Sequence, residues 1–171
     1  MIFDRIRRKK RELQERLDDW LEEDERLVIP CMRMTKTAKL PTRGSREAAG
    51  LDLYADLMEP MTIWPGETKN ISSGIAVELP EGYFGGVFCR SGLATNRGLR
   101  LPNCVGVIDS DYRGPIGVAL HNDSHERQVV LPGERVAQLI ILPYPEVKLM
   151  EVAALSATER GENGFGSTGR R

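Results

Sequence analysis

The sequence of 171 residues has little cysteine, histidine or aromatic content and no long apolar run. Its three cysteines include no CxxC pair, which argues against a disulfide framework and a zinc knuckle and favours a reducing compartment. The longest nearly apolar run, 136–142, is interrupted by Gln138 and is far shorter than the ~20 residues of a membrane-spanning helix. No apolar stretch follows the basic N-terminal residues, so we expect no secretory signal and a cytoplasmic protein, or a nuclear one if the source is eukaryotic or viral.

An excess of charge of one sign is also absent. The 24 Lys and Arg residues balance 25 Asp and Glu residues, which argues against a strongly basic nucleic-acid-binding protein and against an acidic disordered chain. Glycine (17) and proline (10) are instead frequent, which indicates a turn-rich protein rather than a helical bundle. The length fits one domain with a sizeable hydrophobic core.

Residues 1–26 differ from the rest of the chain, because most of their side chains are charged and none is glycine or proline. Basic residues come first, at 5–11, and acidic residues last, at 18–25, an order that opposes the helix dipole. We therefore predict a charged amphipathic helical arm that docks on its own oligomer, with a protein partner or weakly bound nucleic acid as the alternatives. Its apolar positions fall on one helical stripe, formed by Ile6, Leu13, Leu17, Trp20 and Leu21.

From residue 27 onward, short runs rich in β-branched residues alternate with turn signals such as WPGE, LPEG and LPGE. Many short strands at close spacing are typical of a β-sandwich or barrel, so we predict an all-β domain over residues 27–158 with one short helix within 91–99. The glycine-rich residues 159–171 are predicted to form a flexible tail. The predicted strands are 27–34, 50–55, 68–71, 75–78, 84–89, 99–101, 105–109, 116–120, 127–131, 135–144 and 148–151.

Two segments have the composition of a phosphate-binding site. The tail segment GFGSTG, 164–169, combines hydroxyls with glycines whose backbone N–H groups can approach a phosphate, and it holds an aromatic residue, Phe165. It lacks the lysine of a Walker loop, and a plain flexible tail is the alternative. In CRSGLA, 89–94, Arg90 and Ser91 follow a predicted strand and open the predicted helix, which favours an anion site. A serine N-cap beside a solvated arginine is the alternative.

Carboxylate side chains form a second kind of candidate functional site. Asp109 and Asp111 follow a predicted strand in NCVGVIDSDYRG, 103–114, where close carboxylates can hold a metal-bound water or act as a base. A polar hairpin tip with an Asx turn is the alternative. Asp52 begins another strand, and Gln138 interrupts an apolar one, where a buried amide needs a partner.

The cysteines and histidines carry weaker signals. Cys89 and Cys104 lie in apolar, strand-like surroundings and are predicted to be small buried side chains. His121 and His125 are four residues apart, but they lie in a turn signature without a third ligand nearby, which argues against a metal site.

Five segments resemble, in sequence order, the five motifs of the trimeric dUTPase family. They are AGLDLYA (49–55), RSGLA (90–94), GVIDSDYRG (106–114), RVAQLII (135–141) and RGENGFGSTG (160–169). The resemblance spans residues 49–169 and leaves residues 1–26 outside. It implies a jelly-roll-like β-barrel (a β-clip), assembled as a homotrimer whose three active sites each draw on three chains. It also implies hydrolysis of dUTP to dUMP and pyrophosphate with Mg²⁺, which keeps uracil out of DNA and supplies dUMP for dTMP synthesis.

The same resemblance implies a role for individual residues. Asp109 matches the carboxylate that activates the attacking water, and Tyr112 the aromatic residue that packs under the deoxyribose and excludes a 2′-hydroxyl. Asp52 matches a carboxylate that contacts Mg²⁺ indirectly, through a metal-bound water. Phosphate contacts are implied for Arg90, Ser91, Gly92 and Gln138. Recognition of uracil is implied for Asn103, Gly106, Val107 and Ile108. The lid that grips the γ-phosphate and stacks over uracil matches Arg160, Phe165, Gly166, Ser167 and Thr168.

The implied chemistry suits the residue types. Triphosphate hydrolysis needs positioning and charge neutralisation more than covalent catalysis, and Mg²⁺ accepts oxygen ligands from waters and phosphates. One alternative is the related dCTP deaminase, which needs a glutamate to activate water at C4 of cytosine, but no glutamate follows Gly114 until Glu126. Another is a nucleotide-sensing interaction protein that binds a partner through its arm. The intact Asp109 and tail motifs argue against a purely binding role.

Overall fold

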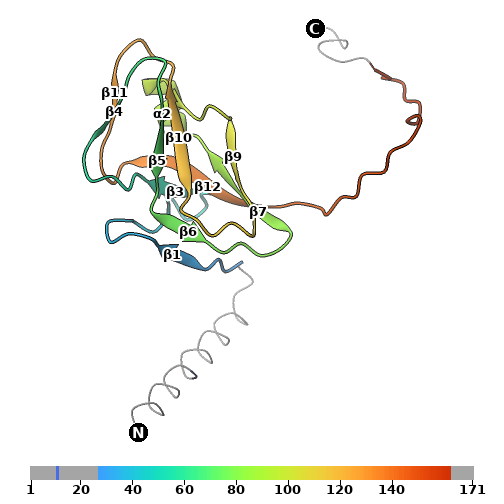
Figure 1. The fold of residues 1–171 in the computed structure, drawn as a ribbon, viewed down its shortest axis with the longest axis horizontal. Coiled ribbons are helices and arrows are strands. Elements are labelled where there is room, and N and C mark those ends of the chain that lie inside the picture. The colour runs from blue at the N-terminus through green and yellow to red at the C-terminus, as the bar shows by residue number, and fades with distance from the viewer. Residues whose placement is uncertain (1–10, 12–26, 163–171) are drawn as a thin grey trace.

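The computed structural model describes Arg11 and residues 27–162 (Figure 1). The rest of the predicted arm, and tail residues Phe165, Gly166, Ser167 and Thr168, lie outside the described residues. From residue 27 the elements are, in order, β1 (Cys31–Arg33), β2 (Thr42–Arg43), β3 (Leu51–Tyr54), β4 (Met61–Ile63), β5 (Thr68–Ser72), β6 (Ile75–Val77), β7 (Tyr83–Phe88), α2 (Ser91–Arg97), β8 (Leu99–Arg100), β9 (Val105–Ile108), β10 (Gly117–Asn122), β11 (Gln128–Val130) and β12 (Arg135–Pro143).

The strands form antiparallel sheets around one core. The largest sheet has five strands in the order β2-β3-β12-β7-β9, and a three-stranded sheet has the order β5-β10-β8. Two ribbons, β1-β6 and β11-β4, complete the body (Figure 1). Fully buried aliphatic side chains from these sheets pack together, among them Leu53, Ile71, Val118 and Leu139. The predicted all-β domain with one short internal helix is confirmed for this part of the chain.

The short helix α2 is defined by local sequence. It begins at Ser91, directly after the N-cap residue Arg90, and it ends at Gly98, whose left-handed backbone (φ 64°) lets its N–H bond the carbonyl oxygens of Leu93 and Ala94. A side chain at Gly98 would also press on the backbone of Ser124. The α2–β8 corner therefore requires glycine. The first turn of α2, at the other end of the helix, follows β7 after only two residues.

Most predicted strands are confirmed within one or two residues, one predicted strand is wrong, and two observed strands were not predicted. The segment 148–151 is not a strand in the described chain, because no neighbouring strand lies beside it to accept its backbone hydrogen bonds. β2 and β4 were missed. Both are too short to show alternation in the sequence, and each exists through pairing with a longer-range partner, β3 and β11 respectively.

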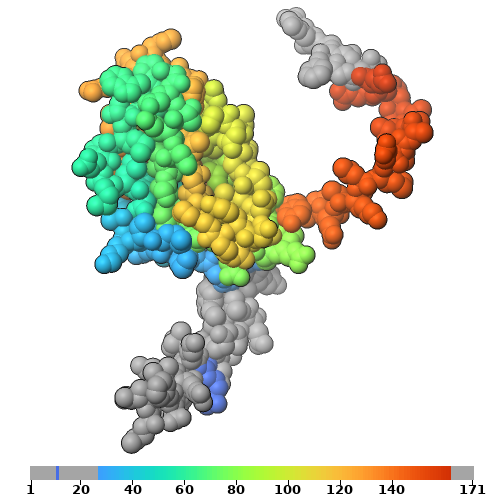
Figure 2. All heavy atoms as spheres, in the orientation of Figure 1, coloured from blue at the N-terminus to red at the C-terminus, as the bar shows by residue number. Residues whose placement is uncertain are grey.

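Residues 144–162 leave the body as an extended segment (Figures 1 and 2). Their apolar side chains are among the most exposed in the described chain, with Leu149 at 93% and Leu155 at 89%. Such side chains are normally covered in a working assembly. Within residues 27–162 and at Arg11, no helix has both the length and the apolar character to cross a membrane.

Candidate active site

The register of the five-stranded sheet brings distant motif residues onto one face. Gln138 of β12 lies directly opposite Asp52 of β3 and opposite Phe88 of β7. Directly opposed residues in antiparallel strands point to the same side of a sheet. Arg90, two residues beyond Phe88, continues on that side. Three motifs separated in the sequence therefore meet at one end of one sheet face.

Asp52 is the centre of this group, and it is only 2% exposed. Its Oδ2 accepts a hydrogen bond from Arg135 Nη1 at 3.1 Å, and its Oδ1 lies 3.1 Å from Arg90 Nε. Arg90 Nη1 also donates to the backbone carbonyl of Arg135 at 3.4 Å. A buried carboxylate is tolerated only with such charged partners. Asp52 thus orients two guanidinium groups side by side.

The Asp52–Arg90 contact is an ion pair without a directed hydrogen bond. By hydrogen-bond geometry, Asp52 Oδ1 and Arg90 Nε are both buried without a partner in the described chain, although they lie 3.1 Å apart. One acceptor lone pair on Asp52 therefore remains for a donor such as a water molecule.

The first turn of α2 is open beside this group. Arg90 has an extended backbone (φ −81°, ψ 131°) and occupies the N-cap position, and no side chain makes a capping hydrogen bond. The alternative of a serine N-cap is wrong, because Ser91 is already the first residue of the helix. Ser91 and Gly92 are exposed, and a Cβ at Gly92 would meet nothing within 4 Å. The backbone at this turn can therefore be approached closely.

The second half of the candidate site is the turn after β9. Asp109 is exposed, and its backbone carbonyl accepts a hydrogen bond from Tyr112 N at 3.1 Å. Tyr112 is 44% exposed, and its hydroxyl donates to the carbonyl of Pro115 at 3.1 Å. A Cβ at Gly114 would collide with the Tyr112 ring and hydroxyl, so glycine at this position leaves room for the ring where it lies. The turn holds the tyrosine ring in one place beside an accessible carboxylate.

The two halves do not meet within one chain. β9 runs antiparallel to β7, with Val105 opposite Phe88 and Ile108 opposite Gly85. Asp109 therefore lies beyond the Gly85 end of β7, whereas Arg90 lies beyond its Phe88 end. At roughly 3.3 Å per strand residue, the separation along the sheet is about 20 Å. Asn103 precedes β9 and lies at the Arg90 end, so the predicted uracil-reading residues run between the two halves.

Cysteine burial differs from the prediction. Cys104 is exposed and has a left-handed backbone (φ 63°), because it forms the tight turn before β9 and does not lie within a strand. The prediction of a buried Cys104 is wrong. Cys89 is half-buried against the core, and burial raises the pKa of its thiol above the ordinary value.

His121 bonds Thr68 Oγ1 at 2.8 Å through Nδ1 and lies 3.2 Å from Asp123 through Nε2.

Sequence reasoning missed one residue of the site, Arg135. It opens the RVAQLII motif, but its role depends on contact with Asp52, 83 positions earlier in the chain. The available signal was a cation at the start of a strand that also carries Gln138, facing a strand that carries Asp52. Antiparallel pairing of these two motifs would have joined the charges.

The geometry can be compared with known proteins. A family model described as dUTPase matches residues 36–169. The chain belongs to the dUTPase family. This confirms the resemblance drawn from the five motifs.

Curated dUTPase relatives match over most of their length. The deoxyuridine 5'-triphosphate nucleotidohydrolase of Anaplasma marginale is 47% identical over 130 residues, which cover 76% of this chain and 88% of that protein. That of Desulfitobacterium hafniense is 47% identical over 145 residues, 84% of this chain and 96% of the relative.

Solved dUTPase structures share the fold. A mutant dUTPase of Staphylococcus bacteriophage 80alpha with dUpNHpp has a TM-score of 0.73 at 30% identity and covers 84% of this chain and 99% of its own. A mutant dUTPase from phage phi11 of S. aureus, described as coordinating a structural Mg(II) ion, has a TM-score of 0.70 at 23% identity. It covers 77% of this chain and 100% of its own, and at this identity it supports the fold alone.

Proposed function

We propose that this chain is a dUTP diphosphatase that hydrolyses dUTP to dUMP and pyrophosphate. One observation carries the proposal. The buried Asp52 carboxylate holds two arginines at the open first turn of α2. Backbone N–H groups, the Ser91 hydroxyl and two guanidinium groups are the donors that a phosphate chain requires. The family membership of the chain agrees with this substrate.

Asp109 is the proposed general base. It would take a proton from a water directed at the α-phosphorus, so that the water oxygen forms a bond to phosphorus while pyrophosphate leaves. Its exposed position after β9 leaves it accessible to that water. The Tyr112 ring would lie against the deoxyribose, where a 2′-hydroxyl would project. The donors of α2 and Arg90 would stabilise the charge that develops on the phosphates.

Asp52 fits an indirect contact with Mg²⁺. Its unused acceptor on Oδ1 suits a hydrogen bond from a metal-bound water, while its two arginine neighbours do not suit direct coordination. Among the described residues no group of three or more His, Cys, Asp or Glu side chains forms a metal cage. Mg²⁺ bound to the triphosphate would neutralise phosphate charge. Arg90 and Gln138 would then orient the phosphates against the Asp52 side of the site.

A shared active site in a homotrimer is part of the proposal, and the separation of the two halves supports it. Because Asp109 and Arg90 lie about 20 Å apart along one sheet, a single chain cannot apply both to one triphosphate. If the turn after β9 of one copy lies beside the first turn of α2 of another copy, Asp109 and Arg90 come close to the same triphosphate. The Gln138 face of the sheet also carries half-buried apolar side chains of the kind found at subunit interfaces, namely Phe84, Phe88, Ile140 and Leu142.

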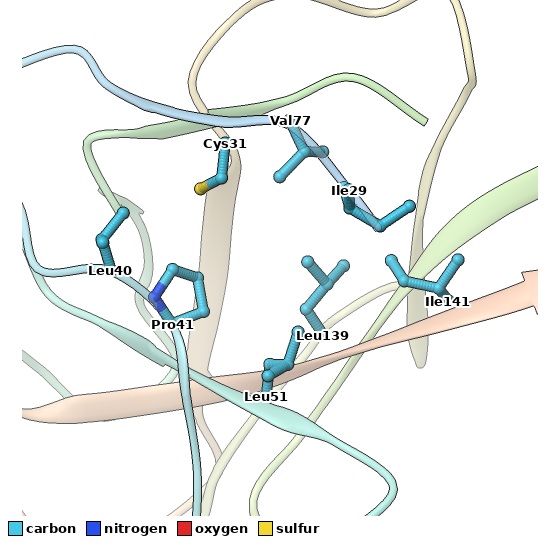
Figure 3. A pocket seen from close by; sticks show the side chains of 8 residues that line it. All are labelled: Ile29, Cys31, Leu40, Pro41, Leu51, Val77, Leu139 and Ile141. Carbon is cyan, nitrogen blue, oxygen red and sulfur yellow. The ribbon is translucent and has the colours of Figure 1, made fainter. Parts of the chain in front are cut away.

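The extended segment 144–162 is the proposed crossing arm between copies. An apolar groove of about 220 Å³ lies on the other side of the five-stranded sheet, between that sheet and the β1-β6 ribbon (Figure 3). In the described sheets β1 pairs on one side only, with β6, so its other edge can accept a strand. The exposed side chains of 147–155 include apolar ones that could pack against the apolar side chains of this groove. The groove is lined by Ile29, Cys31, Leu40, Pro41, Leu51, Val77, Leu139 and Ile141.

The thiol of Cys31 gives a test of this arm. Cys31 and Cys104 are both exposed in a single chain, and partial burial in the groove raises the pKa of the Cys31 thiol. If another copy covers the groove, alkylation of Cys31 should be slower by about tenfold or more in the full chain than in a chain ending at Tyr144. Peptide mass mapping measures both rates, with Cys104 as the internal reference. Equal rates of Cys31 alkylation in the two chains would contradict a covering arm.

The activity itself is tested by pyrophosphate release from dUTP with Mg²⁺. We expect release from dUTP, little release from UTP, and no ammonia from dCTP, which separates the proposal from a deaminase. Tyr112→Ala should narrow the preference for dUTP over UTP, because the packed ring that rejects the 2′-hydroxyl is lost. Similar kcat/KM values for dUTP and UTP in the parent protein would contradict the proposal that Tyr112 excludes a 2′-hydroxyl. Failure to release pyrophosphate from dUTP would sink the proposed function.

A further inference from the structure

All three nitrogens of the Arg97 guanidinium, in the last turn of α2, donate to acceptors in β11 and in the turn between β11 and β12. Nε donates to Gln128 Oε1 at 3.1 Å, and Nη2 donates to the carbonyl of Val129 at 2.6 Å. Nη1 donates to Glu134 Oε1 at 2.5 Å. The Arg97 side chain is 27% exposed, so these contacts are partly shielded from solvent. A planar fork that spans three acceptors fixes direction as well as distance.

Glu134 connects the Arg97 side chain to the residues around Asp52. Its second carboxylate oxygen accepts from Leu131 N at 2.9 Å and closes the turn between β11 and β12. Its backbone carbonyl accepts from Ala55 N at 2.8 Å, just after the strand that carries Asp52. The next residue, Arg135, donates to Asp52. Arg97 is thus joined to the Asp52 carboxylate through two consecutive residues, Glu134 and Arg135.

α2 is therefore attached at both ends to consecutive residues at the start of β12, Arg135 and the turn residue Glu134. Arg90 binds the Arg135 carbonyl and Asp52 at the start of the helix, and Arg97 binds Glu134 at its end. Between them, Leu93 is the helix residue buried in the core. A helix of 7 residues has little stability of its own, so its direction depends on such contacts.

We infer that Arg97 is a positioning residue for the reaction: by clamping α2 to Glu134, it sets where Arg90, Ser91 and Gly92 meet the phosphates. This inference rests on the proposed function, because it assumes that the first turn of α2 receives the triphosphate. Without the clamp, α2 can pivot about Leu93 and Arg90. Displacing aligned groups by about 1 Å can cost on the order of 10²-fold in rate.

The test compares Arg97→Met with Arg100→Met as the matched control. Arg100 is a nearby surface arginine that pairs with Asp123 and, within the described part of the chain, contacts neither Asp52, Arg90 nor Arg135. We expect Arg97→Met to lower kcat for dUTP by about tenfold or more and to weaken inhibition by pyrophosphate by about fivefold, with deoxyuridine binding unchanged within about twofold. Arg100→Met should keep all three values within about twofold of the parent.

Two further variants make the outcome decisive. Arg97→Lys should be intermediate, because an ammonium can pair with Glu134 but cannot span three acceptors. Glu134→Gln should reproduce the Arg97→Met pattern, and it carries the test should Arg97→Met fail to fold. A kcat within about twofold of the parent, or equal losses of pyrophosphate and deoxyuridine binding, would overturn the positioning role. A parent protein inactive on dUTP is a separate result, which removes the proposed function itself.

Discussion

Asp109→Asn should lower kcat for dUTP by roughly 10²- to 10⁴-fold, the usual effect of removing a general base. Asparagine keeps the size and polarity of the side chain but cannot accept the proton of the attacking water. Because Asp109 is exposed and the turn is closed by its backbone carbonyl, the fold and most of the affinity for dUTP should remain. Steady-state kinetics and the thermal unfolding midpoint measure the two effects separately.

Asp111→Asn is the matched control for this experiment. Asp111 lies two residues further along the same turn and is also exposed to solvent. If Asp109 is the base, the Asp111 variant should keep kcat within about twofold of the parent. An Asp109 variant with near-parental kcat would show that another group activates the water, and a large loss in the Asp111 variant alone would assign the base to that residue.

A chain ending at Glu159 should lose most turnover while its fold and assembly remain. The removed residues 160–171 carry the glycine-rich motif, and the described body is complete without them. With a triphosphate bound, Arg160 would bind its phosphates, Ser167 and Thr168 would donate to phosphate oxygens, and Phe165 would cover the flat base. The closed tail would exclude water from the phosphates. Single-turnover kinetics and light scattering measure turnover and assembly.

A chain ending at Gly169 is the control, since it removes only the two terminal arginines and keeps the whole motif. It should retain near-parental turnover, and Phe165→Ala should lose part of the rate. Trypsin should cleave after Arg160 more slowly when a non-hydrolysable dUTP analogue and Mg²⁺ are present. Equal cleavage rates with and without the analogue would count against closure of the tail over the substrate.

The sequence was sufficient for the fold class, the family and the identity of most candidate residues. Turn signals and short β-branched runs are local features, so most strands could be placed within one or two residues. The motifs around Asp52, Arg90 and Asp109 are also local, because each places its candidate residue near the boundary of a strand or a helix. Local features of this kind can be recognised in the sequence without knowledge of the tertiary structure.

The tertiary structure decided everything that depends on contact between distant segments. Sequence alone could not join Asp52 to Arg135, 83 positions away, or Arg97 to Glu134, because strand register determines which side chains face each other. It misjudged Cys104, whose exposure follows from a left-handed turn. It also predicted a strand at 148–151, but a strand needs a neighbour. Register, burial and pairing are properties of the folded chain, and they separate Asp109 from Arg90 along one sheet.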